Sequence, residues 1–173
     1  KYKSGNLPLN KDNVPLKTVL NEAVKAAKPL VENKDISLIA SVSPLLPENV
    51  YGDRQRFERI LQNLLSNAVK FTENGSIKLH AEEVQKNSDV ILISFVISDT
   101  GIGISEEHQQ KIFGQFSRVD PSHSSKYEGS GLGLSIVKQF VQEMGGDIAL
   151  DSTEGEGSTF TFCIPFKLDT VQN

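Results

Sequence analysis

The chain has 173 residues, of which 18 are basic and 22 acidic, and its formal charge is −4. That length suits one domain with a sizeable hydrophobic core. The mild acidic balance gives no electrostatic footprint for nucleic acid and no polybasic face for a membrane. Because one cysteine cannot form an internal disulfide and no apolar run could span a bilayer, we expect a cytoplasmic piece without membrane contact of its own. Whether its parent is anchored in a membrane stays open.

The first third of the chain predicts a polar lead-in, a helix and a strand. Pro15 is expected at the first helical position, where its missing N–H costs nothing. The apolar rhythm then continues, with a kink at Pro29, to about Asn33. A strand is expected over Ile36–Val42, followed by a loop over Ser43–Asn49.

A second helix is expected from a cap at Asp53 to about Phe71. Opposite its apolar stripe lies a polar face made of Arg56, Arg59, Asn63, Asn67 and Lys70. For the arginines, an ordinary solvated face is an equally good interpretation. Asparagine is a poor residue inside a helix, because its side chain competes for the backbone. Two asparagines four residues apart therefore indicate a ligand site.

The middle of the chain predicts an antiparallel hairpin over Ser76–Glu83 and Val90–Ser98, with the second strand central in its sheet. This strand runs directly into Asp99-Thr100-Gly101-Ile102-Gly103-Ile104. An ionised carboxylate there can accept a hydrogen bond from an exocyclic amine, and the glycines let a flat ring lie against the backbone. The alternative is a plain turn at the end of a strand.

A long segment without apolar periodicity follows. Ser105 is expected to cap a short helix that carries Ile112 and Phe113, and the pattern then disappears over Gly114–Gly129. A loop of this length in a compact domain is usually functional or disordered. Its position before a glycine-rich run favours a mobile lid whose cations reach phosphates when it closes.

The run Glu128–Leu134 alternates three glycines and leads into a helix that should end at Gly145-Gly146. Glycines before a helix start make an anion site, most naturally for phosphate, although a flexible turn before a surface helix fits equally well. The run lacks the Lys-Ser/Thr of a P-loop. Strands are expected over Asp147–Ser152 and Ser158–Ile164, with a tight turn between them. The histidines His80, His108 and His123 have no partner at metal-like spacing.

The order of these motifs resembles the catalytic ATP-binding domain of two-component histidine kinases, and the lid is most similar to those of hybrid kinases. That domain belongs to a superfamily shared with gyrase, the mismatch-repair ATPases and a heat-shock chaperone. The resemblance extends over residues 14–166, with residues 1–13 as the lead-in from a missing dimerisation domain and 167–173 as a polar tail. It is carried by five motifs: Asn63–Thr72, Asp99–Ile104, Phe113–Phe116, Gly129–Leu134 and Gly155–Phe160.

This resemblance implies a fold and a ligand. The fold is α/β, a two-layer sandwich of the Bergerat type, with a mixed sheet of about five strands and three main helices on one face. The ligand is ATP with Mg²⁺. Asp99 would read the adenine amino group, Asn67 would be the chief magnesium ligand with Asn63 beside it, and Lys70 would face the phosphates. The catalytic residues implied are thus Asn63, Asn67 and Lys70.

The resemblance also places residues of the lid and of the glycine run at the nucleotide. Phe113 and Phe116 would anchor the lid, where Lys126 and Tyr127 have counterparts in hybrid kinases, and the amides near Ser130 would hold the β- and γ-phosphates. The full nucleotide-binding set implied is Asn63, Asn67, Lys70, Phe71, Asp99, Gly101, Ile102, Gly103, Ile104, Phe113, Phe116, Arg118, Lys126, Tyr127, Gly129, Ser130, Gly131, Leu132, Gly133, Leu134 and Thr159.

One position bears on the reaction. The hydrolases of the superfamily resemble one another in a glutamate four residues before the metal asparagine, and here that position is Asn63. A carboxamide cannot act as a general base for water, which favours phosphoryl transfer over hydrolysis. None of the three histidines has the setting of a phosphoacceptor, so the expected partners are a histidine-bearing dimerisation domain of the same protein and a receiver domain. The isolated piece should be monomeric.

Two alternatives remain from the sequence. One is a non-catalytic nucleotide-binding or docking module, against which the complete motif set argues. The other is an ATPase of the gyrase or mismatch-repair type, which Asn63 disfavours. Arg59 stands where many relatives carry glutamine, and its role, like that of Arg56, is left open.

Overall fold

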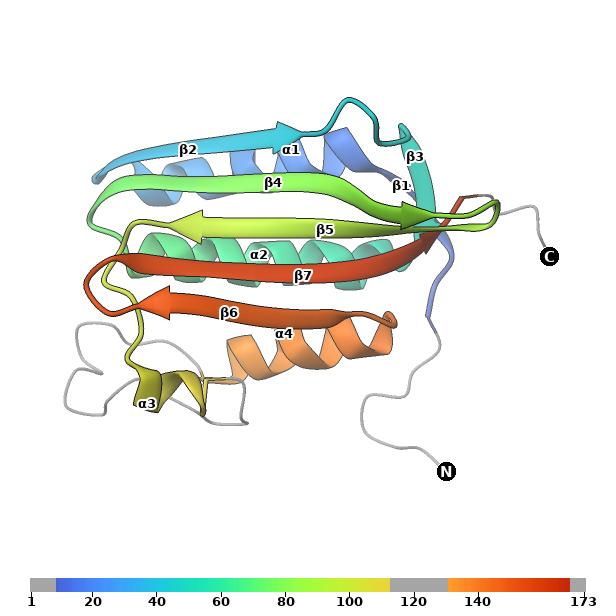
Figure 1. The fold of residues 1–173 in the computed structure, drawn as a ribbon. Helices are drawn as coiled ribbons and strands as arrows, with labels where there is room; N and C mark the ends of the chain where they lie inside the picture. The colour runs from blue at the N-terminus through green and yellow to red at the C-terminus, as the bar shows by residue number, and fades with distance from the viewer. Residues whose placement is uncertain (1–8, 113–130, 169–173) are drawn as a thin grey trace.

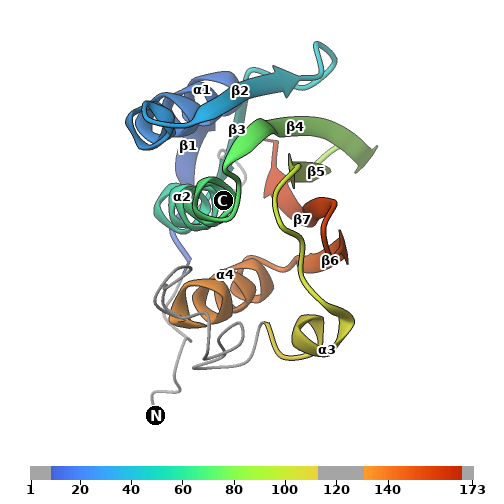
Figure 2. The same cartoon turned by 90° about the vertical axis from the view of Figure 1, so that its left-hand side faces the viewer.

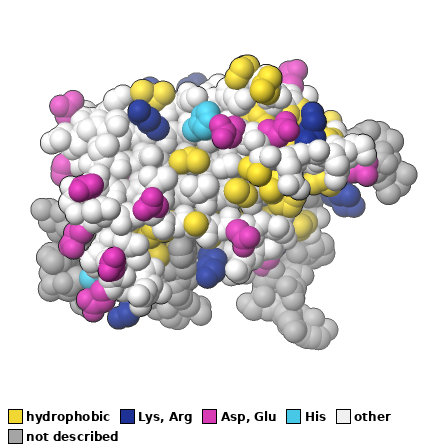
Figure 3. Space-filling model, in the orientation of Figure 1, with side chains coloured by type: hydrophobic (Ala, Val, Ile, Leu, Met, Phe, Trp, Pro, Cys, Tyr) yellow, Lys and Arg dark blue, Asp and Glu magenta, His cyan; other side chains and the backbone are white. Residues whose placement is uncertain are grey.

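The computed structural model of the chain describes residues 9–112 and 131–168. These residues form a two-layer α/β sandwich, as predicted. Three helices, α1 (Leu16–Ala27), α2 (Arg54–Lys70) and α4 (Gly131–Glu143), cover one face of a single sheet (Figures 1 and 2). The other face carries no helical layer in the described part, and apolar, charged and small polar side chains are mixed on it (Figure 3).

The sheet has seven strands in the described residues, where about five were predicted. Their order is β1-β3-β7-β5-β4-β2, with β6 paired to β7. Only the pairing of β2 with β4 is parallel among these, so the sheet is mixed. The strands are β1 (Asp12–Pro15), β2 (Asp35–Val42), β3 (Asn49–Gly52), β4 (Asn74–Lys86), β5 (Val90–Asp99), β6 (Asp147–Thr153) and β7 (Gly157–Lys167).

Two of these strands, β1 and β3, were not predicted. Each has four residues, and they pair with each other in antiparallel fashion. The two strands join the rest of the sheet through one residue pair, Tyr51 of β3 with Lys167 of β7. The partner that attaches them to the sheet is therefore distant in the sequence. Such short segments carry no usable periodicity. The strand predicted over Ser76–Glu83 is longer at both ends, since β4 extends from Asn74 to Lys86.

The first helix differs from the prediction at both ends. Pro15 is the N-cap residue, with an extended backbone, and the helix proper begins at Leu16. The helix ends at Ala27, and a 3₁₀ turn over Lys28–Val31 contains Pro29. A proline there removes an i→i−4 hydrogen bond and ends the helix instead of merely kinking it. The predicted extension to Asn33 is therefore wrong.

The core lies between the helical layer and the sheet. Phe57 of α2 points into it, with its ring centroid 4.9 Å from that of Phe95 on β5 and 5.4 Å from that of Phe166 on β7. The Phe95 and Phe162 rings stack at 5.0 Å. Full burial of one such side chain stabilises the fold by about 2–3 kcal/mol. These contacts join α2 to the central strands and fix the helix that carries Asn63 and Asn67.

The remaining elements follow the prediction closely. The β4–β5 hairpin is antiparallel, and β5 is an inner strand. Ser105 caps α3 (Glu106–Gln109) by accepting a hydrogen bond from the His108 amide, but this helix ends before Ile112, which it was predicted to carry. The helix α4 ends just before Gly145, whose φ is 86°. Among the described helices, none has the length and apolar content that crossing a membrane requires.

Candidate functional site

The helix α2 presents the two asparagines that the sequence singled out. Its N-terminus is capped by the Asp53 carboxylate, which accepts a hydrogen bond from the Arg56 amide at 2.9 Å. Asn67 lines a pocket beside the end of β5. Asn63, one turn earlier, donates from Nδ2 to the Gly133 carbonyl in the first turn of α4, at 3.3 Å. The predicted polar face of α2 thus meets the predicted glycine run.

Asp99 ends β5 and pairs with Ser158 of β7, which lines this pocket. Its Oδ1 accepts hydrogen bonds from the Gly101 amide at 2.9 Å and the Ser158 amide at 3.3 Å. Burial raises the pKa of the Asp99 carboxyl, and the two amides offset only part of that effect. Within residues 9–112 and 131–168, no hydrogen bond to Oδ2 is found. The two amides thus orient the Asp99 carboxylate through Oδ1 and leave Oδ2 available to a ligand.

The two glycines after Asp99 are required by close packing of protein against protein. A Cβ on Gly101 would lie 2.2 Å from the Phe71 carbonyl oxygen, and one on Gly103 would lie 2.1 Å from the Thr153 carbonyl oxygen. Gly103 also has a φ of 71°, a backbone angle that residues other than glycine rarely adopt. The prediction that these glycines let a flat ring lie against the backbone stays a prediction. The geometry shows that they let the loop approach α2 and the β6–β7 turn.

Main-chain hydrogen bonds complete this anchoring. The Ile102 amide donates to the Phe71 carbonyl at 3.1 Å, and the Gly155 amide donates to the Ile102 carbonyl at 2.6 Å. Ser152 adds a side-chain link, because its Oγ accepts from the Ile104 amide at 2.8 Å and donates to the Gly157 carbonyl at 2.8 Å. The loop is thereby fixed to both neighbours along its whole length.

Gln109 of α3 ties the same loop to β6. Its Nε2 donates to the Ile104 carbonyl at 2.6 Å and to the Ser152 carbonyl at 2.9 Å. One amide side chain therefore holds α3 in place against the end of the Asp99 loop. Sequence reasoning missed Gln109 and Ser152, since neither belongs to a recognisable motif.

The pocket between α2, the Asp99 loop and β7 is small and mostly apolar. Its volume is about 30 Å³. The lining residues are Asn67, Ala68, Phe71, Ile102, Gly103, Ile104, Ile112, Leu134, Ser158 and Phe160. Next to it, the buried Thr72 hydroxyl finds no hydrogen-bond partner within the described residues.

Six of the predicted residues line this pocket, namely Asn67, Phe71, Ile102, Gly103, Ile104 and Leu134. Asn63, Gly133, Asp99 and Gly101 are joined to its surroundings by the hydrogen bonds described above but are not lining residues. Two further residues lie elsewhere. Thr159 projects to the opposite face of the sheet, where its hydroxyl lies 3.3 Å from that of Ser98. Its neighbour Ser158 takes the place in the pocket that we had expected for Thr159. Lys70, the last residue of α2, is half-exposed and is not a lining residue.

Other predicted residues cannot be placed in the same detail. Gly131 and Leu132 form the first turn of α4, and nothing further is described of them. The predictions that lie outside the described residues are Phe113, Phe116, Arg118, Lys126, Tyr127, Gly129 and Ser130.

Arg56, on the predicted polar face, has a structural setting. Its guanidinium pairs with Asp53 and, through Nε, with Glu143 at the end of α4 at 2.8 Å, and it lies 5.5 Å from the Phe140 ring centroid. Only 11% of this side chain is exposed. Burial alone would raise the pKa of Asp53, but hydrogen bonds from the Arg56 and Asn10 amides, together with the Arg56 guanidinium, lower it. The cluster joins the two helices at the end away from the pocket.

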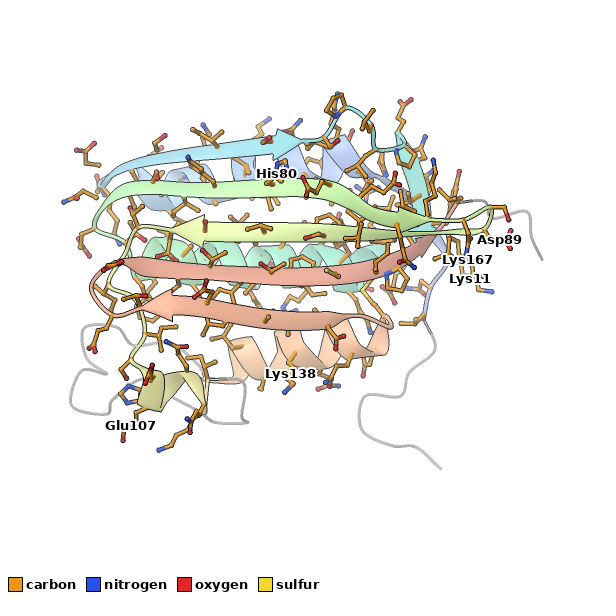
Figure 4. The ribbon with its side chains drawn as sticks, in the orientation of Figure 1. Lys11, His80, Asp89, Glu107, Lys138 and Lys167 are labelled. Atoms are coloured by element: carbon orange, nitrogen blue, oxygen red, sulfur yellow. The ribbon has the colours of Figure 1, made fainter. Side chains whose placement is uncertain are left out.

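The histidines have ordinary settings where they are described. His80 projects from the outer face of the sheet (Figure 4), with its ring nitrogens 3.1 Å from Ser41 Oγ and 2.9 Å from Glu82 Oε1. His108 bonds the Ser105 hydroxyl at 2.8 Å. In the described parts of the chain, no group of histidine, cysteine and acidic residues could hold a metal ion. The oxygen donors available beside the pocket are the carboxamides of Asn63 and Asn67, which suit a hard cation such as Mg²⁺ that already carries phosphate and water.

Comparison with known proteins is consistent with this arrangement. Residues 52–168 match the family described as histidine kinase-, DNA gyrase B- and HSP90-like ATPases, and the chain belongs to that family. Within the family, it is a catalytic domain of the histidine kinase type.

Curated relatives are long signalling proteins. The chain is 38% identical over 165 residues to hybrid signal transduction histidine kinase B of Dictyostelium discoideum, covering 95% of this chain and 8% of that protein. It is 39% identical over 169 residues to the signal transduction histidine-protein kinase BarA of Escherichia coli K12, covering 98% of this chain and 18% of BarA. The chain thus spans less than a fifth of either relative.

Solved structures show the same fold. Full-length ShkA, crystallised in complex with AMPPNP, superposes with a TM-score of 0.82 at 30% identity, covering 95% of this chain and 33% of ShkA. The catalytic domain of the histidine kinase ThkA superposes with a TM-score of 0.69 at 29% identity, covering 90% of this chain and 95% of that domain.

Proposed function

We propose that the chain binds Mg-ATP and presents the γ-phosphate to a histidine on a separate dimerisation domain. One observation carries the choice of transfer over hydrolysis. By resemblance, Asn63 occupies the position at which the hydrolases of the superfamily carry the glutamate that activates water. Its Nδ2 already donates a hydrogen bond to the Gly133 carbonyl oxygen. A neutral carboxamide in that place holds and orients groups but cannot accept a proton from water.

The base would bind at the Asp99 end. The free Oδ2 of Asp99 would accept a hydrogen bond from the adenine amino group, while Oδ1 stays on the Gly101 and Ser158 amides. Ile102, Ile104 and Phe160 supply apolar walls for the ring. ShkA, which has the same fold, was crystallised in complex with AMPPNP, and this supports nucleotide binding by a domain of this kind.

The phosphates would bind at the start of α4. The first turn of a helix offers unpaired N–H groups and a positive dipole end, which favour an anion. Asn63 of α2 holds this turn through its hydrogen bond to the Gly133 carbonyl. Lys70, at the end of α2, would supply a positive charge. Arg118 and Lys126, which lie outside the described residues, are predicted to add to it.

The Oδ1 atoms of Asn67 and Asn63 would hold the magnesium ion. When bound, the ion neutralises phosphate charge and fixes the phosphate geometry. The acceptor histidine nitrogen would form a bond to the γ-phosphorus as the bond to the β–γ bridging oxygen breaks, releasing ADP. The residues of this chain contribute by positioning the nucleotide and by excluding an ordered water from the attack position.

In the whole protein, the phosphoryl group would pass from the histidine to a receiver aspartate. Hybrid kinases among the relatives are consistent with such partners. We further propose that the domain works in the cytoplasm and that the isolated chain is monomeric.

Two measurements test the proposal. The first is calorimetric titration of the chain with a non-hydrolysable ATP analogue, with and without Mg²⁺. Magnesium-dependent binding is expected, and Asn67→Ala should remove that dependence. A dependence that survives this substitution would exclude Asn67 as the main ligand.

The second joins the chain to its histidine-bearing domain and follows acid-labile phosphate. Formation of phosphohistidine is expected. Its absence, with ATP binding intact, would leave a non-catalytic nucleotide-binding module. Steady phosphate release by the chain alone that Asn63→Ala abolishes would instead indicate an ATPase.

A further inference from the structure

A lysine outside the predicted motifs holds the end of α2. Lys34 lies between the 3₁₀ turn that follows α1 and the strand β2. Its Nζ donates hydrogen bonds to the carbonyl oxygens of Val69 at 2.7 Å and Thr72 at 3.0 Å, and it lies 3.6 Å from Oε2 of the exposed Glu73. Only 23% of the Lys34 side chain is exposed, whereas most lysines lie on the surface. Its closest contacts are thus to the main chain.

The two carbonyls lie where a helix favours a cation. The last carbonyls of a helix have no amide of the next turn to bind, and the negative end of the helix dipole lies among them. Since α2 ends at Lys70, Val69 belongs to its last turn and Thr72 follows its C-cap residue, Phe71. Lys34 therefore caps α2 with a positive charge that comes from a different element of the fold.

The segment that Lys34 holds also carries the contact with the Asp99 loop. Phe71 lies between the two residues that Lys34 contacts, and its carbonyl oxygen accepts a hydrogen bond from the Ile102 amide at 3.1 Å. A Cβ on Gly101 would lie 2.2 Å from the same oxygen, so the loop is packed directly against it. The Gly101 amide in turn orients the Asp99 carboxylate through its 2.9 Å bond to Oδ1.

These elements meet at one end of the sandwich. The ends of α2 and β5 lie beside the starts of β2 and β4 (Figure 1). In the sheet, Asp35 of β2 pairs with Asn74 of β4, and Ile77 of β4 pairs with Asp99. Lys34, which directly precedes β2, is thus at the same end of the sheet as Asp99, although the two are distant in the sequence.

We propose that Lys34 is a positioning residue of the nucleotide site. Its ammonium group fixes the Val69 and Thr72 carbonyls, and this fixes the main chain between them. The Asp99 loop takes its position from the Phe71 carbonyl in that segment. Lys34 acts through the main chain and does not itself contact the nucleotide. The inference rests on the proposed function, in which Asp99 accepts a hydrogen bond from adenine.

Three substitutions separate the contacts of Lys34, and a fourth is the control. Lys34→Met removes the donors but keeps a long, unbranched side chain. Lys34→Arg keeps charged donors, and Glu73→Gln removes only the ion pair. Lys28→Met, at an exposed position in the 3₁₀ turn, removes a positive charge elsewhere on the same segment.

Each variant is titrated with the non-hydrolysable ATP analogue and Mg²⁺, under conditions in which circular dichroism shows that it is folded. We expect Lys34→Met to bind the analogue roughly tenfold more weakly, because the Asp99 loop loses a fixed support. Lys34→Arg should stay within about threefold of the unmodified chain, since its guanidinium can donate to both carbonyls. Glu73→Gln and Lys28→Met should stay within about twofold, because exposed charges contribute little.

A double-mutant cycle distinguishes positioning from a contribution to stability alone. Lys34→Met is combined with Asp99→Asn, which alters the group that Lys34 is proposed to orient. In that background, Lys34→Met should cost less than about threefold in affinity, because residues that act through one contact are not additive. A cap that only stabilises the fold would leave the affinity of the folded protein unchanged in both backgrounds.

If Lys34→Met does not fold, Lys34→Gln is measured in its place. It keeps a neutral donor, so we expect a loss of roughly three- to tenfold and the same coupling to Asp99.

Several results would overturn the inference. An unchanged affinity in the folded Lys34 variant would limit this residue to stability. Equal losses with and without Asp99→Asn would show that Lys34 does not act through the Asp99 loop. A loss in Glu73→Gln as large as in Lys34→Met would assign the effect to the ion pair. If the unmodified chain does not bind the analogue, the proposed function itself fails, which is a distinct outcome.

Discussion

At the base end of the candidate site, main-chain contacts fix the loop from Asp99 to Ile104, whereas at the phosphate end side chains fix α4 against α2. The loop is held by amides that donate to Asp99, Phe71 and Ile102, and by glycines in close contact with neighbouring carbonyls. The helix α4 is joined to α2 through Asn63 near its start and Arg56 at its end, so the two helices run antiparallel.

This difference separates two kinds of sensitivity. A loop fixed by its backbone tolerates most side-chain changes but not an added Cβ at its glycines. A helix fixed by a few long side chains depends on those side chains individually. The predictions below exploit this contrast.

The largest effect is expected in the contact between α2 and α4, from Arg56→Met. The change leaves the nearly buried carboxylates of Asp53 and Glu143 without their common cation, and unpairing a buried charge costs about 3–5 kcal/mol. Because part of the Arg56 cluster reaches solvent, we expect about 3 kcal/mol from urea unfolding. Arg54→Met, two residues earlier, breaks only exposed pairs and should cost less than about 1 kcal/mol. Equal losses would show that burial of the cluster contributes nothing.

A second prediction tests the base end with Gly103→Ala. The new Cβ would lie 2.1 Å from the Thr153 carbonyl oxygen at a φ of 71°, so the loop or the β6–β7 turn has to shift. We expect roughly 2–3 kcal/mol of lost stability and weaker binding of the ATP analogue. The matched control is Gly155→Ala, which has a φ of 87° but no heavy atom within 4 Å of its Cβ. It should cost only the backbone strain of about 1–2 kcal/mol, so similar losses in the two variants would refute the packing role of Gly103.

Asp99→Asn should affect binding and stability in opposite directions. It removes the charge that accepts the adenine amino group, at a cost of roughly 1–3 kcal/mol in binding. Burial raises the pKa of the Asp99 carboxyl in the folded state, so the ionised form lowers the stability of the fold at neutral pH. This loss of stability decreases as the pH falls through the raised pKa, and it is gone below 3.8, the pKa of the carboxyl in the unfolded chain. The variant should therefore be more stable than the unmodified chain at pH 7, with the difference shrinking in acid. Calorimetry and pH-dependent unfolding measure the two effects, and a variant less stable at pH 7 would contradict the second.

The smallest expected effect is a difference in binding of the ATP analogue between variants of two adjacent residues, Ser158 and Thr159. Ser158 lines the pocket and bonds Ser152, whereas Thr159 lies on the other face of the sheet. Ser158→Ala should weaken binding of the analogue by about 1 kcal/mol, and Thr159→Ala should leave it unchanged within error. A loss confined to Thr159→Ala would mean that β7 shifts its register when the nucleotide binds.

The sequence predicted the long elements well because each has its own periodicity. The α2 and α4 helices and both hairpins were found within a few residues of their ends. The strands β1 and β3 were missed, since four-residue segments gain their structure from partners such as Lys167, which lies more than a hundred residues from Tyr51.

The errors in the candidate site have similar causes. Ser158 could have been preferred over Thr159, because it shares the even-numbered positions of β7 with the buried Phe160 and Phe162. The setting of Arg56 depends on Glu143, and the need for Gly103 depends on Thr153. No local pattern reports such partners.

The contact between Asn63 and Gly133 restricts how this domain can change during evolution. A glutamate at position 63, the residue found there in the hydrolases of the superfamily, would bring a carboxylate oxygen towards a carbonyl oxygen where a hydrogen bond now exists. The first turn of α4 would have to move before the new base could act. A change from asparagine to glutamate at this position would therefore affect the start of α4 as well as the chemistry of the side chain.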